Sequence, residues 1–197
     1  MSGLPIEMAK EGTRAWIKGL PEGKSECALT TFNDGNFMVQ EFTNDKQILL
    51  DKVNQYNAGG GTDYNAAMID PLFGGLLVTD NAQYKKVLVV ISDGMPNFEP
   101  NTQHIITEAQ KRGVTVFSVT LGYKCPDNLK QISESRGGLW FENVTTVEEA
   151  KQIYLNILRY SQNANPCEIE WRSEYLCKNQ DVEVSCEYNL LKSQDKY

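Results

Sequence analysis

Residues 85–94 read Lys-Lys-Val-Leu-Val-Val-Ile-Ser-Asp-Gly, an uninterrupted run of mostly β-branched residues that ends in a polar turn. A strand without polar–apolar alternation is typical of a parallel sheet that helices cover on both faces, because both of its sides are then buried. Ligands of such folds bind beyond the carboxyl ends of the strands. The run therefore predicts a central strand of an α/β fold, with Asp93 at the edge where ligands bind.

Strand and helix patterns alternate on both sides of this run. Apolar runs predict strands near 27–33, 37–43, 86–92, 114–121 and 139–144. The first two are joined by the residues Asn-Asp-Gly-Asn at 33–36, which are typical of a hairpin turn. Apolar residues at helical spacing predict helices near 6–20, 46–56, 102–112, 128–135 and 147–161, and another that begins near Asp63. The alternation predicts a doubly wound, mostly parallel sheet with one antiparallel strand.

The pattern changes in the last part of the chain. Residues 167–171 and 181–186 alternate between polar and apolar side chains, as half-exposed strands do. We therefore expect an α/β domain over 1–163 and a partial, small β-rich module over 164–197. Three of the five cysteines, Cys167, Cys177 and Cys186, lie in this module. Their clustering favours one disulfide there, and with it an extracytoplasmic or cell-surface location.

Composition and charge argue against several classes of function. The 197 residues carry a net charge of -7, which disfavours nucleic acid and anionic membrane surfaces as partners. No apolar run approaches the roughly 20 residues of a membrane helix, and residues 1–20 lack the pattern of a signal peptide. His104 is the single histidine, and no Gly-x-Ser-x-Gly elbow occurs. We therefore expect a protein that is not an enzyme.

Two polar features converge on the expected ligand edge. Residues 57–62, Asn-Ala-Gly-Gly-Gly-Thr, lead into the helix near Asp63, and Asp93 follows the most apolar strand. A hard cation such as Mg²⁺ prefers oxygen ligands, so the Thr62 hydroxyl and the Asp93 carboxylate are candidate metal ligands. The glycines alone also fit a plain turn or a phosphate-binding loop, but the lysine of a P-loop is missing. An aspartate after a strand is, taken alone, more often a turn residue.

The order and spacing of these features resemble one known family. Residues 60–67, Gly-Gly-Thr-Asp-Tyr-Asn-Ala-Ala, and residues 89–94, Val-Val-Ile-Ser-Asp-Gly, resemble the von Willebrand factor type A family. Residues 2–10 are similar to its first helix, and the resemblance extends over 1–162. It implies a metal ion-dependent adhesion site in which Thr62 binds Mg²⁺, Mn²⁺ or Ca²⁺ directly and Asp93 binds through water. The implied partner is a protein that offers an acidic residue.

One motif of that family has no counterpart in these residues. By resemblance, Asp-x-Ser-x-Ser ends a first, central strand just before the first helix and supplies three of the five protein groups around the metal. We therefore expect that strand to be cut away and metal binding to be weak or absent in this chain. We also expect a strand-wide gap between 27–33 and 86–92, unless a segment such as 167–172 fills it.

Two functions follow as expectations. The first is an adhesion or protein-interaction module whose metal ion-dependent adhesion site is incomplete. The alternative is a metal-free scaffold of the same fold that binds protein partners through other surfaces.

Overall fold

The computed structural model describes residues 3–57, 59–162, 183–188 and 191–196. The chain divides into two units, Met1–Asn165 and Pro166–Tyr197, which are described separately. The first unit contains α1 (Leu4–Gly19), β1 (Cys27–Phe32), β2 (Asn36–Thr43), α2 (Lys46–Asn54), α3 (Tyr64–Ile69), α4 (Gly75–Val78), η1 (Thr79–Asn81), β3 (Val87–Ser92), α5 (Thr102–Arg112), β4 (Thr115–Leu121), α6 (Asp127–Glu134), β5 (Trp140–Val144) and α7 (Val147–Ser161). The second unit contains the antiparallel strands β6 (Glu183–Tyr188) and β7 (Leu191–Lys196).

The doubly wound α/β prediction is confirmed, and the predicted strands of the first unit agree with the observed ones to within one or two residues. The short helices α4 and η1 were not predicted, because neither is long enough to show a helical period. Strand β7 was not predicted either, since its sequence, Leu-Lys-Ser-Gln-Asp-Lys, is almost wholly polar. The predicted strand at 167–171 lies outside the described residues.

Two further predictions concern the same region. Cys167 and Cys177 lie outside the described residues, as does the side chain of Cys186, so the disulfide stays a prediction. The division of the chain into domains at 1–163 and 164–197 also stays a prediction.

The expected single sheet is divided into two. Strand β4 pairs in parallel with β3 on one side and β5 on the other, whereas β1 and β2 form a separate antiparallel hairpin. Within the described part of the chain, no strand lies between β1 and β3, and these two strands are not paired with each other. Among the described residues the predicted gap is therefore present, and the segment that was expected to fill it, 167–172, lies outside them.

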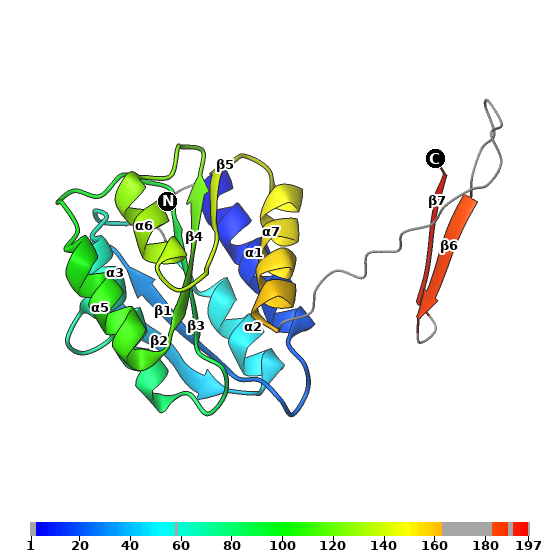
Figure 1. The fold of residues 1–197 in the computed structure, drawn as a ribbon, viewed down its shortest axis with the longest axis horizontal. Helices are drawn as coiled ribbons and strands as arrows, with labels where there is room; N and C mark the ends of the chain where they lie inside the picture. Colours follow the sequence, from blue (N-terminus) through cyan, green and yellow to red (C-terminus); the bar gives the residue numbers. More distant parts are fainter. Residues whose placement is uncertain (1–2, 58, 163–182, 189–190, 197) are drawn as a thin grey trace. The chain divides into compact units, whose positions relative to one another are not determined.

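Helices cover both faces of the parallel sheet (Figure 1). On one face, α1 and α7 pack on side chains of β3, β4 and β5, including Val89, Phe117 and Val144. On the other face, α3, α4, α5 and α6 pack on Leu88 and Val90. Alternate residues of β3 thus point into different apolar clusters, which is why its sequence lacks polar positions.

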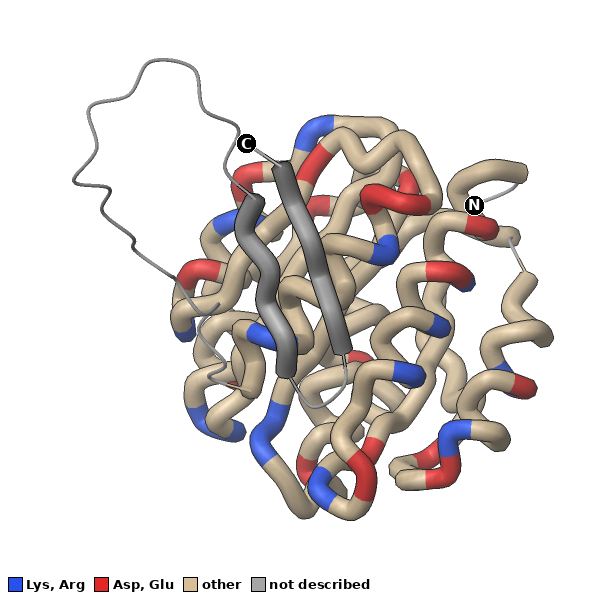
Figure 2. The backbone as a smooth tube through the Cα atoms, turned by 90° about the vertical axis from the view of Figure 1, so that its right-hand side faces the viewer, with Lys and Arg blue, Asp and Glu red and all other residues tan. Residues whose placement is uncertain are grey.

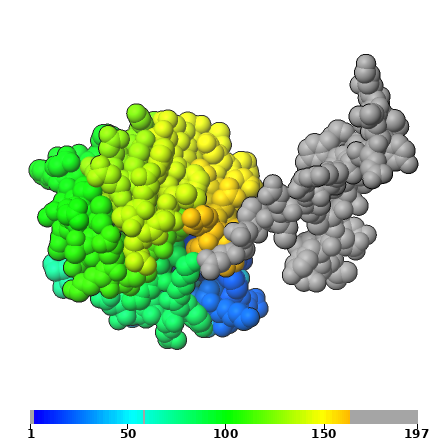
Figure 3. Space-filling model, viewed as in Figure 1, coloured from blue at the N-terminus to red at the C-terminus, as the bar shows by residue number. Residues whose placement is uncertain are grey.

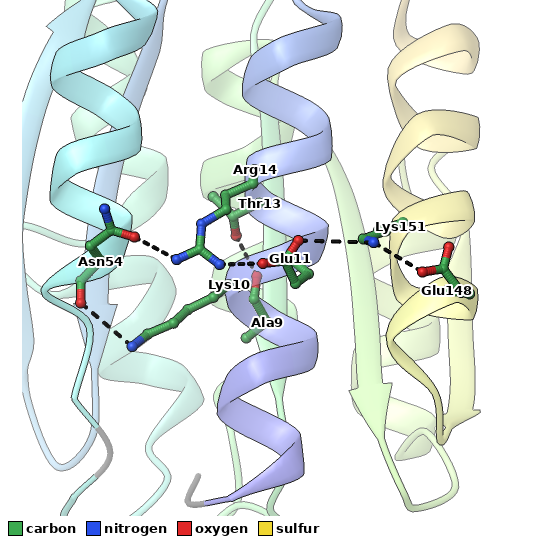
Figure 4. A network of polar contacts seen from close by, with 8 residues as sticks. All are labelled: Ala9, Lys10, Glu11, Thr13, Arg14, Asn54, Glu148 and Lys151. Atoms are coloured by element: carbon green, nitrogen blue, oxygen red, sulfur yellow. Dashed lines mark hydrogen bonds and ion pairs between the residues drawn. The ribbon is translucent and has the colours of Figure 1, made fainter.

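Helix α1 joins the two sheets on one face. Met8 and Ala9 pack in the cluster of the parallel sheet, Ile17 packs with Leu29 of β1, and Trp16 contacts both groups. Polar contacts also connect α1 to its neighbouring helices, as Figure 4 shows.

These polar contacts connect α1 to a helix on each side. The Arg14 guanidinium donates to the Asn54 side chain at the end of α2 over 2.5 Å, and it also pairs with Glu11. Glu11 in turn lies 3.9 Å from the Lys151 ammonium group of α7. Helix α1 is therefore tied both to the helix above the hairpin and to the helix above the parallel sheet.

The opposite face is bridged by α3 and the segment that follows it. The Asn36 amide of β2 donates to the carbonyl groups of Ala67 and Phe73, over 3.0 and 2.8 Å. The ring of Phe32 in β1 meets the ring of Tyr64 edge-on, with centroids 6.4 Å apart. Within the described residues, the two sheets are therefore held together by helices on both faces and not by strand pairing.

Candidate functional site at the carboxyl edge of the sheet

The loop before α3 lies between the ends of β1 and β3. On one side, the Gly61 amide donates to the Asp34 carboxylate over 3.0 Å, and the Asp63 amide donates to the Asn33 carbonyl over 2.9 Å. Both acceptors belong to the turn after β1. These two hydrogen bonds hold the loop before α3 against the hairpin.

The other side of the same loop is fixed to the turn after β3. The Asn97 amide donates to the Thr62 carbonyl over 2.8 Å, and the Thr62 amide donates to the Asn97 side-chain oxygen over 3.3 Å. Thr62 is therefore held by a reciprocal pair of hydrogen bonds, which fixes the direction of its side chain.

Two glycines make this close approach possible. Gly60 has a φ of 78°, a region that residues with a Cβ seldom enter. A Cβ at Gly61 would overlap the side chains of both Asp34 and Asn97. The glycines of this loop thus allow it to pack between the turn after β1 and the turn after β3. This packing accounts for the glycines without a bound phosphate.

The structure brings the two predicted site residues to the same place. The Thr62 hydroxyl oxygen lies 2.8 Å from the position that a Cβ on Gly94 would take, so it packs against the residue that follows Asp93. Both Thr62 and Asp93 are half-buried at the carboxyl edge. Their proximity agrees with the sequence analysis, and their role as metal ligands stays a prediction.

The backbone beneath Asp93 is held by three hydroxyl groups. The Tyr64 and Tyr123 hydroxyls each lie 2.8 Å from the Gly94 carbonyl oxygen and 2.8 Å from each other, and the Ser92 hydroxyl donates to the same carbonyl over 3.1 Å. Burial raises the pKa of both tyrosines, so both stay protonated donors at neutral pH. This cluster keeps the Asp93 turn in one conformation.

Asp63 has a structural role. Its carboxylate oxygen Oδ1 accepts hydrogen bonds from the amides of Asn65 and Ala66, over 2.8 and 3.2 Å, and so caps α3.

The oxygen donors at this edge are too few for a complete cation site. Mg²⁺ takes six ligands in near-octahedral geometry and keeps only some of them as water. Thr62 and Asp93 supply one hydroxyl and one carboxylate, and Asp34 already accepts from Gly61. Over the described residues, no group of three His, Cys, Asp or Glu side chains could hold a metal. The residues present therefore do not by themselves fit the metal that the family pattern implies.

Exposed apolar side chains lie in the turn that follows Asp93. Met95 is 60% exposed and Phe98 is 68% exposed. Both stand within a few residues of Asp93, beside Asn97, which holds Thr62. Single exposed apolar side chains are ordinary on protein surfaces, but two so close in one turn can form part of a contact surface for a partner.

Sequence reasoning missed Asp34, Asn97, Tyr64 and Tyr123 at this edge. Asp34 looked like an ordinary hairpin residue, and Asn97 follows a proline in what looked like a plain turn. The two tyrosines are 59 positions apart, and only the fold brings their hydroxyls together. The carboxyl-edge rule could have placed Asn97, because it lies in the turn directly after the predicted central strand.

The fold and this edge define a doubly wound α/β domain whose ligand position lies at the carboxyl ends of parallel strands. The profile of the von Willebrand factor type A domain matches residues 7–159, and the chain belongs to this family. Domains of this family mediate protein–protein interactions. A comparison with curated proteins finds no match.

Several solved structures share the fold. A von Willebrand factor type A structure from Catenulispora acidiphila has a TM-score of 0.68 at 17% identity, over 79% of this chain and 38% of that one. BatB, a conserved hypothetical protein from Bacteroides thetaiotaomicron, has a TM-score of 0.63 at 15% identity, over 80% of this chain and 88% of that one.

Proximal thread matrix protein 1 from the mussel byssus, with a zinc-occupied MIDAS motif, has a TM-score of 0.62 at 14% identity, over 79% of this chain and 40% of that one. The chain thus spans about two fifths of the length of the mussel protein. At these identities the likeness shows the fold alone.

Two surface properties complete the description. Acidic and basic residues are interspersed along the backbone of the first unit in the view of Figure 2. Among the described helices, none combines the length and the apolar character needed to cross a membrane.

Proposed function

We propose that this chain is a protein-interaction module of the von Willebrand factor type A kind, with an incomplete metal ion-dependent adhesion site at the carboxyl edge. The observation that carries the proposal is the placement of the Thr62 hydroxyl against Gly94, beside Asp93. The exposed Met95 and Phe98 side chains in the same turn support a protein partner, because such a partner would cover them. The partner offers an acidic residue to the site when further oxygen ligands complete it.

A second candidate, a metal-free scaffold of the same fold, is favoured by a different observation. The described residues contain no group of three His, Cys, Asp or Glu side chains that could hold a metal. On this reading, the hydrogen bonds that Gly61 donates to Asp34 and Thr62 donates to Asn97 only fix the turns, and partners bind elsewhere.

Metal titration of two chains separates the candidates. One is the 197-residue chain, and the other carries an added N-terminal strand that ends in Asp-x-Ser-x-Ser. We expect calorimetry with MgCl₂ and MnCl₂ to give micromolar binding to the extended chain only. Binding to the extended chain is lost in Thr62→Ala and Asp93→Ala, while Asp63→Asn, at the helix cap, keeps it. An extended, folded chain that binds no metal overturns the first candidate and supports the scaffold.

We further propose an extracytoplasmic or cell-surface setting, which rests on the cysteine cluster of the C-terminal module. Peptide mapping of the chain purified under non-reducing conditions tests it. A disulfide among Cys167, Cys177 and Cys186 is expected, and three free thiols after oxidative refolding would contradict the proposal.

A further inference from the structure

One short motif of the sequence lies at the end of β5. Residues 143–145 read Asn-Val-Thr, the acceptor pattern for N-linked glycosylation, in which any residue but proline stands in the middle. Among all asparagines of the chain, only Asn143 is followed two positions later by Ser or Thr. A pattern this short also occurs by chance, so its place in the fold decides whether it can carry a sugar.

The motif begins in a β-bulge. Phe141 of β5 lies opposite Val119 of β4, and Val144 lies opposite Leu121, so three steps along β5 correspond to two along β4. A bulge of this kind re-aims a side chain of the longer strand. Asn143 lies in the bulge with a φ of 57°, and in the described part of the chain it is the one residue other than glycine with a positive φ.

The backbone conformation alone does not require an asparagine at position 143. Asparagine tolerates the left-handed region better than most residues with a Cβ, but glycine tolerates it best. The other positive-φ positions of the described residues are glycines, among them Gly122 and Gly137. Position 143 differs from these because it keeps a side chain, and this residue is exposed.

The residues next to Asn143 are fixed to the fold. The Glu142 carboxylate accepts a hydrogen bond from the Cys125 amide over 3.0 Å and lies 3.2 Å from the Lys130 ammonium group. Val144 is fully buried. The backbone of the motif is therefore held in place on both sides of Asn143.

The two side chains that define the motif are not used by the fold. Thr145 is exposed, and its backbone amide donates to the Glu149 carboxylate over 3.0 Å. Within the described residues, neither the side-chain amide of Asn143 nor the hydroxyl group of Thr145 makes a hydrogen bond. Both groups are therefore open to solvent and to a modifying enzyme.

We propose that Asn143 carries an N-linked oligosaccharide. In the modification, the side-chain nitrogen of Asn143 bonds to the anomeric carbon of the first sugar, and the bond from that carbon to the pyrophosphate of a lipid-linked oligosaccharide donor breaks. The amide releases one proton, and no net oxidation or reduction takes place. The proposal rests on the extracytoplasmic setting proposed above, because sugars of this kind are attached to secreted proteins.

The oligosaccharide would stand at the end of an outer strand. Within the described chain, β5 pairs with β4 alone, so its other side is an open edge of the parallel sheet. Figure 3 shows β5 and the start of α7, coloured yellow-green to yellow, at the surface of the first unit. Open strand edges promote pairing with other molecules, and bulky, solubilising sugars oppose it. The sugar on Asn143 thus covers the end of this edge.

The test expresses the full chain behind a cleavable signal peptide in cultured animal cells. We expect the secreted protein to migrate faster in electrophoresis after treatment with a peptide-N-glycosidase. That enzyme converts a glycosylated asparagine to aspartate, so mass spectrometry of the tryptic peptide 137–151 should show this conversion at Asn143. A secreted, folded chain that the enzyme does not change overturns the proposal.

Three variants locate the sugar. Thr145→Val removes the hydroxyl group of the motif, whereas Thr145→Ser keeps it. Asn143→Gly removes the acceptor and suits the φ of 57°. We expect the sugar to be absent from Thr145→Val and Asn143→Gly and present on Thr145→Ser, with all three folded by circular dichroism. A sugar that persists on Thr145→Val or on Asn143→Gly overturns the assignment.

The experiment is independent of the natural location of the chain. The added signal peptide supplies the setting, so an unmodified protein would contradict the glycosylation site alone. The setting itself is tested by the disulfide mapping described above.

A moved motif tests the covering of the β5 edge. Gly23 is exposed, has a φ of 67° and precedes Lys24 and Ser25, so Gly23→Asn combined with Thr145→Val transfers the motif to another left-handed position. Enzymatic removal of the sugar should lower the temperature at which light scattering detects aggregation more in the original chain than in this double variant. Equal shifts would show that the sugar does not act at the β5 edge.

Discussion

Strands β3 and β4 are parallel neighbours with similar apolar sequences, yet they are buried to different extents. Six of the seven residues of β4 are buried, whereas only two of the six residues of β3 are. Helices cover both faces of each strand, so the difference comes from the sides: β4 has a strand on both, and β3 has a strand on one. A central strand thus owes much of its burial to its two strand neighbours. The sequence of β3 still has the apolar composition of a strand with a neighbour on each side.

The largest loss of stability is expected where α1 packs against the β1–β2 hairpin. Ile17 is fully buried against Leu29, Leu49 and Val53, on the hairpin side of that helix. Ile17→Ala should lower the free energy of unfolding by about 2–5 kcal/mol, measured by urea denaturation. The control is Leu4→Ala at the other end of α1, where the side chain is 55% exposed and the cost should stay below about 0.5 kcal/mol. Equal costs would show that α1 does not hold the hairpin.

A pair of identical substitutions tests the comparison directly. Val116 of β4 is 1% exposed, while Val89 of β3 is only half-buried and borders the gap between β1 and β3. Val116→Ala removes two buried methyl groups and should cost about 2 kcal/mol, against about 1 kcal/mol or less for Val89→Ala. Urea denaturation measures both, and a Val89→Ala cost as large as that of Val116→Ala would mean that the gap is closed in solution.

Alkaline pH should weaken the packing around the gap between β1 and β3. Burial raises the pKa of the Cys27 thiol to about 12, against the lowering effect of a hydrogen bond to Trp16, and it also raises the pKa of Tyr56 and Tyr154. All three residues line the cavity in this gap. The fold favours their neutral forms, whereas the unfolded chain ionises its thiols from about pH 8.5 and its tyrosines from about pH 10. Stability is therefore fully present below about pH 8.5 and falls as pH rises towards 12.

The measurement is the urea midpoint between pH 8 and pH 11. It should fall with rising pH, and it should fall less steeply in Cys27→Ala, which removes one of the three groups. Parallel curves for the two proteins would show that Cys27 does not contribute.

The smallest effect is expected for the ion pairs beside α1. Lys151 lies near Glu11 of α1 and pairs with Glu148 over 2.9 Å, with its side chain about one third exposed. Pairs of this kind contribute little because water screens them. Lys151→Ala should change the free energy of unfolding by less than about 1 kcal/mol, and a larger loss would mean that the polar link matters as much as apolar packing.

Much of the fold could be predicted from the sequence, because each strand and helix carries a local signal. The unbroken apolar run of β3, the Asn-Asp-Gly-Asn turn before β2 and the period of α7 each identified one element. The gap beside β3 could also be predicted, through a family resemblance that showed which strand has no counterpart. The length of an element limits this approach: α4 has four residues and gives no period.

The candidate site could be predicted only in part. Thr62 and Asp93 carry a signal because each stands at the end of a recognisable pattern. The contacts that fix them do not, since Asp34, Asn97 and Tyr123 come from three separate turns and meet only in the fold. The gap between β1 and β3 was visible as a missing strand, but the closing of its two faces depends on side chains from α1, α4 and α7.

The division of the sheet has a consequence for kinetics. Because no ladder hydrogen bond joins β1 to β3 in the described chain, the hairpin can separate from the parallel sheet by giving up side-chain packing and a few loop hydrogen bonds, such as those of Asn36 and Asp63. Such partial openings cost less free energy than complete unfolding. We therefore expect the amides of β1 and β2 to exchange with solvent hydrogen faster than those of β4, which is paired on both sides.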